Sequence, residues 1–184
     1  MFFTMQIQLG LLLGHYFGVR SPGIIGLLIA VGSLALVAGS IAYRSLARLR
    51  TAVQLLLSFG LIGGGFLLMR MAGTTLQLMI CDVVNQFGCG LLLPALVIWV
   101  MSPLPFALRG RGTGAFMSCW WVGQFLSPQT VILLARRLGG PLAALEWLGL
   151  LSLVAAALAA VVSLRPISRP AFAESSFRSK DRSP

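Results

Sequence analysis

The chain has few charged side chains and almost no acids. Charged residues make up 10% of its 184 residues, and four Asp and Glu stand against fourteen Lys and Arg. It has one histidine and three cysteines, and no CxxC or CxxH pair. Hydrophobic residues reach 58%. This composition excludes an ordinary soluble globular domain, and the cysteine spacing supports neither a zinc site nor a disulfide framework. We therefore expect an integral membrane protein with no metal and no cofactor.

The basic residues give a formal net charge of +10, which we interpret as a topological signal. They lie in short breaks and in a tail, without the interleaved aromatics of a surface that tracks nucleic acid, so we expect no nucleic-acid partner. Ten of the fourteen fall on one side of the predicted membrane and four on the other. The positive-inside rule places the richer side in the cytoplasm. We expect an inner-membrane protein of a bacterium with both termini cytoplasmic.

Six hydrophobic stretches have close to the length that a membrane-crossing helix needs. A hydrocarbon core about 30 Å thick requires about 20 residues of helix. The sequence therefore predicts an all-α membrane protein, with a six-helix transmembrane bundle over 1–164 and a polar, disordered cytoplasmic tail over 165–184. The predicted spans are 1–17, 22–43, 52–69, 74–101, 113–135 and 141–164.

The fourth stretch carries the most informative polar residues. Asn85, Gln86 and Cys89 follow Asp82 at helical spacing, so a helix gathers all four on one side. Asp82 lies about 8 residues, or about 12 Å, into the span. Hydrocarbon offers no hydrogen-bond partner, so this side is expected to face inward. Two readings stay open: an unpaired Asp82 could carry a proton, and an Asp82 paired with an arginine would be a structural clasp.

Polar and aromatic residues in two other stretches are weaker candidates. In the first, helical spacing places Gln8 and His15 on one side. His15 could carry a proton or contact a substrate, but we favour a hydrogen-bonded histidine near the outer interface. In the fifth, Gln124 supplies a buried amide, and Trp120 and Trp121 lie too deep for interface anchors. Those rings could stack on a substrate, although core packing is the more frequent use.

Prolines are expected to bend two of the helices. Pro94 removes a backbone hydrogen bond near the middle of the fourth stretch. Pro128 does the same in the fifth, where Gly123 and Ser127 precede it. Such positions are tolerated in membranes where neighbouring helices or a cavity satisfy the freed carbonyl.

Two local contacts are also predicted. Gly60 and Gly64 form a GxxxG pattern, which is typical of close helix packing. Glu146 lies close in sequence to Arg136 and Arg137, so we expect a local ion pair near the outer end.

Three segments resemble transporters of the major facilitator superfamily, especially its drug:proton antiporters. The residues Gly39, Arg44 and Arg48 match part of the GxxxDRxGRR-like loop between the second and third helices of each half. The run GxGLLLPALVIWV from Gly88, with RGRGTG over 109–114, is similar to the tenth helix and the loop after it. GQFLSP over 123–128 resembles the eleventh helix. The resemblance covers nearly all of 1–164 and implies the C-terminal six-helix half of such a transporter.

The resemblance implies proton-coupled efflux of a small solute, carried out with a second six-helix half or a second copy of the chain in the lipid bilayer. Asp82 would be the titrating group. Hydrogen bonds to the solute would come from the amides of Gln8, Asn85, Gln86 and Gln124. Apolar walls would come from Trp120 and Trp121. The cytoplasmic loops would be latched by Arg44, Arg48, Arg109 and Arg111.

Two other functions are alternatives. The chain could be a truncated remnant or a membrane interaction subunit without transport activity, and the short first stretch with no hydrophilic leader favours this. An enzyme is the weakest possibility. A rhomboid-type protease needs a serine and a histidine deep in the fold, and His15 in the first stretch is the sole histidine. There is no GxSxG and no HExxH motif, so we expect no catalytic site.

Overall fold

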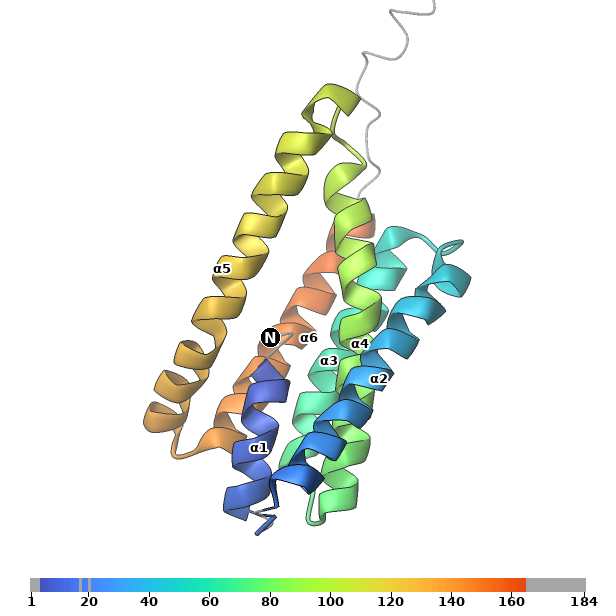
Figure 1. Cartoon of the computed structure of the whole chain (residues 1–184). Helices are drawn as coiled ribbons and strands as arrows, with labels where there is room; N and C mark the ends of the chain where they lie inside the picture. The colour runs from blue at the N-terminus through green and yellow to red at the C-terminus, as the bar shows by residue number, and fades with distance from the viewer. Residues whose placement is uncertain (1–3, 17, 20, 165–184) are drawn as a thin grey trace, which may run out of the picture.

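A computed structural model describes residues 4–16, 18–19 and 21–164. Within these residues the chain forms six α-helices and no strand (Figure 1). Each predicted stretch corresponds to one helix, which confirms the all-α prediction. The predicted tail, 165–184, lies outside the described residues. The helices are α1 (Thr4–Tyr16), α2 (Pro22–Leu46), α3 (Thr51–Arg70), α4 (Thr75–Met101), α5 (Phe106–Leu138) and α6 (Pro141–Leu164).

Four of the helices, α2, α3, α4 and α6, are long and apolar enough to cross a membrane. The length of each of these helices, together with its hydropathy, indicates an integral membrane protein. In contrast, α1 has 13 described residues, too few for a span at 1.5 Å of rise per residue. The long α5 has arginines near both ends and is not among the four.

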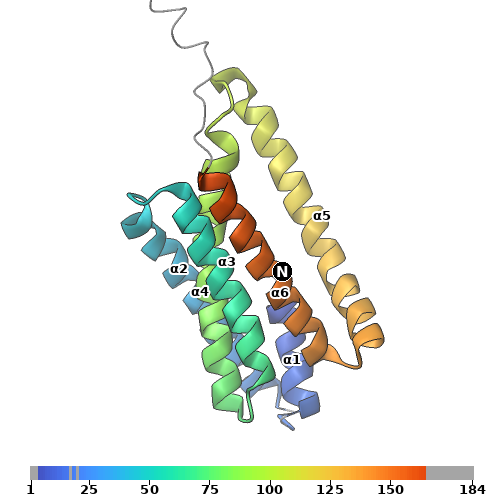
Figure 2. The ribbon, with the colours of Figure 1, turned by 180° about the vertical axis from the view of Figure 1, so that it is seen from behind.

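The four apolar helices pack as a continuous row in the order α2, α4, α3, α6 (Figures 1 and 2). Each neighbouring pair in this row is in extensive contact, whereas α1 and α5 contact the rest more sparsely. The apolar core lies between the helices of the row and between the row and α1. Leu9, Leu12 and Leu13 of α1 are almost completely buried in it. The row is therefore the structural centre of the molecule.

Missing side chains bring the helices of the row together. A Cβ on Gly90 of α4 would collide with the Leu36 carbonyl oxygen of α2, and one on Gly39 of α2 would collide with the Phe87 carbonyl oxygen. Between α3 and α6, a Cβ on Gly63 would lie 2.9 Å from the carbonyl oxygen of Gly149. Backbones that approach this closely gain dispersion contacts, which drive helix association in lipid.

Helix α5 begins earlier than predicted and stands beside the row (Figure 1). The sequence predicted a loop over 103–112, but the helix already starts at Phe106, after Pro105. The Thr113 hydroxyl donates to the Arg109 carbonyl at 2.9 Å, and Leu104 folds back onto Gly112, where a Cβ would overlap its side chain. Gly112, at the end of the predicted loop, therefore lets the preceding turn pack against the helix.

The helices alternate in direction. The connection from α2 to α3 and the connection from α4 to α5 lie at the same end of the molecule (Figure 1). At the opposite end α5 stops at Gly139, which has a left-handed φ of 85°, and α6 begins at Pro141. This confirms the break predicted between the fifth and sixth stretches.

Candidate functional site

The polar side of α4 is buried, as the sequence predicted. The side chains of Asp82, Asn85, Gln86 and Cys89 are each 1% exposed or less. The four lie within two turns of the same helix, but their neighbours differ. Asn85 contacts α3, with Cys89 beside it on α4, whereas Asp82 and Gln86 lie against α2. The polar side therefore divides into a part engaged in packing and a part with unsatisfied groups.

The part engaged in packing is the contact between Asn85 and α3. The side-chain amide Nδ2 of Asn85 donates to the backbone carbonyl oxygen of Ile62 at 2.9 Å. The Cys89 thiol is 3.9 Å from the side-chain oxygen Oδ1 of Asn85. Gly65 of α3 makes room for this approach, because a Cβ there would lie 2.7 Å from Asn85 Cβ. A buried amide engaged with a neighbouring helix acts as an interhelical tie. Asn85 is thus occupied in packing.

The second part consists of Asp82 and Gln86, which face α2 at Gly32. A Cβ on Gly32 would overlap Asp82 Oδ2 and lie 3.5 Å from Gln86 Cγ. Both Asp82 Oδ1 and Gln86 Oε1 are buried and have no hydrogen-bond partner. The carboxyl group is therefore enclosed between α2 and α4 and does not face lipid. In the part of the chain that is described, no arginine forms an ion pair with it.

Two unpartnered acceptors one helical turn apart have a specific chemical capacity. A buried polar atom without a hydrogen bond costs free energy, and a buried charge without a partner costs more. A proton on Asp82 would change one acceptor into a donor, and a cationic or hydroxyl-bearing group entering between α2 and α4 would satisfy both oxygens. The pair is suited to accept a proton or a donor.

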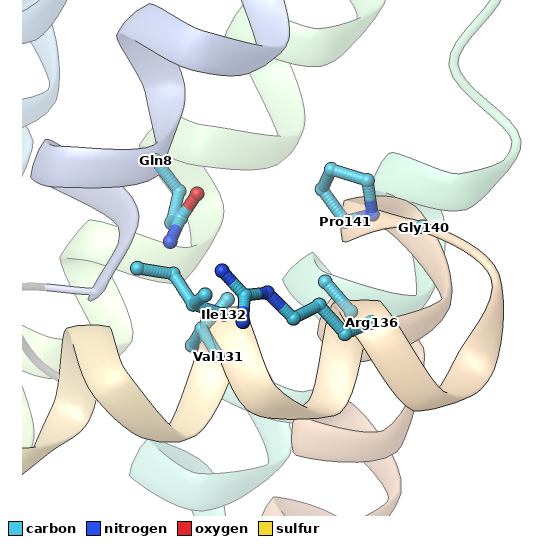
Figure 3. A pocket seen from close by; sticks show the side chains of 7 residues that line it. Gln8, Val131, Ile132, Arg136, Gly140 and Pro141 are labelled. Carbon is cyan, nitrogen blue, oxygen red and sulfur yellow. The ribbon is translucent and has the colours of Figure 1, made fainter.

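A separate pocket lies between α1, the end of α5 and the start of α6 (Figure 3). Its volume is about 280 Å³, and Gln8, Val131, Arg136 and Pro141 are among its lining residues. None of the predicted site residues of α4 lines it. Gln8 is thus buried, as expected of a site residue, but in a different location from Asp82. The side chain of His15 lies outside the described residues.

The predicted site residues of α5 differ in burial. Trp121 is 62% exposed, and Trp120 is half-buried with its ring centroid 6.1 Å from that of Phe116. Gln124 is half-buried, and Gly123 has no atom within 4 Å of the position of its missing Cβ. The predicted apolar wall is therefore not formed by Trp121 within this chain.

The proline-containing segments are helical throughout. Pro94 lies inside α4 and Pro128 lies inside α5, so neither ends its helix. Ser127, next to Pro128, is one of the two buried residues of α5, together with Val131.

The residues assigned to cytoplasmic loops lie largely on helices, which corrects that prediction. Gly39 is buried inside α2, and Arg44 is in its last turn. Arg109 and Arg111 are in the first turns of α5, because the helix begins at Phe106. Arg48 lies in the connection between α2 and α3, as predicted. All four arginines are exposed.

Sequence reasoning missed the contact that holds this connection. The Tyr43 hydroxyl donates to the Gln54 side-chain oxygen at 3.1 Å, and the Gln54 amide donates to the carbonyl oxygens of Leu46 at 2.8 Å and Leu49 at 3.2 Å. A signal was present in the sequence, since Tyr43 carries a hydroxyl group at the end of an apolar stretch. A polar residue at the start of the next stretch was the natural candidate for its partner.

Two predicted contacts are formed by other residues. Glu146 pairs with Arg70 at the end of α3, with Nε and Oε2 at 3.0 Å, instead of Arg136 or Arg137. The prediction was wrong because it considered neighbours in sequence, while α3 and α6 pack side by side. Gly60 and Gly64 meet no atom within 4 Å, and it is their neighbours Gly63 and Gly65 that approach other helices.

The fold and its hydropathy define the chain as an all-α protein with helices of membrane-crossing length. No family model, curated protein or solved structure matches it. The likeness to major facilitator transporters stays a prediction from the sequence.

Proposed function

We propose that the chain is one six-helix half of a major facilitator-type transporter, which moves a small solute by proton-coupled efflux together with a second half or a second copy. The observation that carries the proposal is the pair of unpartnered buried oxygens, Asp82 Oδ1 and Gln86 Oε1, at the contact of α2 and α4. Acids inside apolar helices are costly and are retained mainly where they bind or carry something.

The position of Asp82 suits an exchange of partners. It lies between two helices that touch through backbone at Gly39 and Gly90, so a small displacement of α2 along α4 would change what the carboxyl group faces. In a transporter of this type, two bundles rock against each other around a central path. Proton binding at Asp82 would favour one arrangement, and solute binding at Asp82 and Gln86 the other.

A second half or copy would supply what the single chain lacks. Helix α5 exposes large apolar side chains along its length, including Phe106, Trp121 and Phe125. Lipid can cover them, but part of this face is available to further helices. We place the solute path between such an added bundle and this chain.

The test compares Asp82→Asn with Glu146→Gln in proteoliposomes. A proton gradient is imposed, and efflux of a cationic dye is followed for the chain alone and for two copies joined in tandem. Asp82→Asn keeps the size of the side chain and removes the titrating group, so we expect dye efflux to lose its dependence on the gradient. Glu146→Gln removes an acid that is already paired at the end of α3. It should transport like the unmodified chain.

Equal gradient-driven rates for Asp82→Asn and the unmodified chain would eliminate the proton role. The alternative function, a membrane interaction subunit without transport, is favoured by one observation: Asn85 is engaged in helix packing. If neither the single nor the tandem chain moves dye above protein-free vesicles, that alternative replaces the transport proposal.

A further inference from the structure

We propose that the pocket between α1, α5 and α6 binds an amphipathic anion, with its carboxylate or phosphate group at Arg136 and its apolar part against α5. The site is separate from Asp82 and Gln86, and the inference does not rest on transport. It follows from the charge of Arg136 at the pocket, from the Gln8 amide that lines it and from its predominantly apolar wall.

Among the described residues, the charges at this end of the molecule leave Arg136 without an acid. Two acids are described: Asp82 is enclosed between α2 and α4, and Glu146 pairs with Arg70. Within the described part of the chain, no carboxylate pairs with Arg136. Its guanidinium group offers donors in a planar fork that matches a carboxylate or a phosphate.

The first turn of α6 adds to this preference. Pro141 lines the pocket at the first position of the helix, where the backbone dipole is positive. An anion in the pocket would thus meet a guanidinium group and the start of a helix together. Arg137, the neighbouring cation, does not line the pocket.

The remaining lining fits a molecule with one polar end. Gln8 of α1 is 4% exposed and its amide points toward Arg136 across the pocket (Figure 3). Ile132 and Val131 of α5 form an apolar wall next to them. The volume of about 280 Å³ is near the lower end of the range of about 300–1,000 Å³ typical of ligand pockets. It holds an acidic head group with a short apolar segment, and longer chains would extend outside.

The experiment measures binding of radiolabelled decanoate to the full chain in nanodiscs of neutral phosphatidylcholine, with decanol as the uncharged competitor. Arg136→Gln should weaken decanoate binding about tenfold or more, because a charge-assisted hydrogen bond is lost. Arg137→Gln, in the same turn of α5 but outside the pocket, should bind normally. Ile132→Trp should also lose binding, because the larger side chain would occupy the space beside the apolar wall. Helix content by circular dichroism verifies that all three variants fold.

A second arm distinguishes the source of the anion. Nanodiscs containing phosphatidylglycerol are compared with neutral ones. If this lipid displaces decanoate from the unmodified chain, the site takes a lipid head group; if it does not, the site takes a free amphipathic acid. Either result supports the anion site. The proposal is overturned if decanol competes as well as unlabelled decanoate, if Arg136→Gln and Arg137→Gln weaken binding equally, or if the unmodified chain binds no decanoate.

Discussion

Glycine residues have different surroundings in two regions of the molecule. One region is the row of α2, α4, α3 and α6, and the other is the helix α5. In the row, Gly39 and Gly90 lie where α2 and α4 cross, and a Cβ at either would strike a carbonyl oxygen of the neighbouring helix. In α5, Gly110, Gly114 and Gly123 have no atom within 4 Å of the missing Cβ. At these positions glycine allows close packing in the row and leaves an open surface on α5, where Gly112 against Leu104 is the exception.

Hydrogen bonds follow the same division. The row is tied by side chains that reach a backbone carbonyl of another helix: Ser40 to Gly90 at 3.1 Å, Asn85 to Ile62 at 2.9 Å and Ser152 to Phe59 at 3.0 Å. In α5, the hydroxyl groups of Thr113 and Thr130 bond to carbonyls of their own helix, at 2.9 and 3.0 Å, and the Thr113 hydroxyl also lies 3.5 Å from the Met101 sulfur at the end of α4. Hydrogen bonds between helices thus join the members of the row, and α5 contacts the bundle more sparsely than the row helices contact one another.

The largest effect is expected when one methyl group is added to a glycine of each region, which tests whether the two regions differ in packing. Gly90→Ala should destabilise the protein by about 3 kcal/mol or more, because the Cβ meets the Leu36 carbonyl oxygen and the helices must separate. Gly123→Ala should stabilise it by about 0.5–1 kcal/mol, because alanine is the better helix former and space is open. Loss of helix content on titration with SDS measures both changes. Effects of the same sign would contradict the division.

A smaller effect is expected from the tie between α4 and α3. Asn85→Ala removes the hydrogen bond to Ile62 and leaves a small void, and should cost about 1–2 kcal/mol. Ser118→Ala is the control, since this side chain lies exposed on α5, and should change stability by less than about 0.5 kcal/mol. The same SDS titration compares them. If Asn85→Ala is neutral, Asn85 is free to serve the solute, as the sequence first suggested.

The elements of the fold could be predicted from the sequence because hydrophobic stretches of this length have few alternatives in lipid. The start of α5 could not. Pro105 and the glycines after it are typical of a loop, and the packing of Leu104 on Gly112 that makes the segment helical depends on the tertiary turn. Nor could the order of the row be predicted, because it depends on which glycines face a neighbour, and Gly60 and Gly63 are indistinguishable in sequence.

The candidate site was predictable on one helix at a time. Helical spacing placed Asp82, Asn85 and Gln86 together, and all three are buried. Their partners could not be found, since Gly32 and Ile62 carry no chemical signal in the sequence. The division of the polar side between α2 and α3 therefore required the structure.

The smallest expected effect concerns the ends of the two regions. Arg70 and Glu146 join α3 to α6, but their side chains are 52% and 38% exposed, so solvent screens the pair. Arg70→Gln should cost about 0.2–1 kcal/mol. Arg137→Gln at the end of α5 should cost less, because no ion pair is recorded for it among the described residues. A double-mutant cycle of Arg70→Gln with Glu146→Gln, with stability measured at low and high salt, isolates the coupling energy of the pair.

Salt should reduce this coupling energy, because both side chains are partly exposed. A coupling energy that does not fall as salt increases would mean that the two charged groups are more enclosed than their exposed fractions indicate. Close packing would then continue to the ends of α3 and α6.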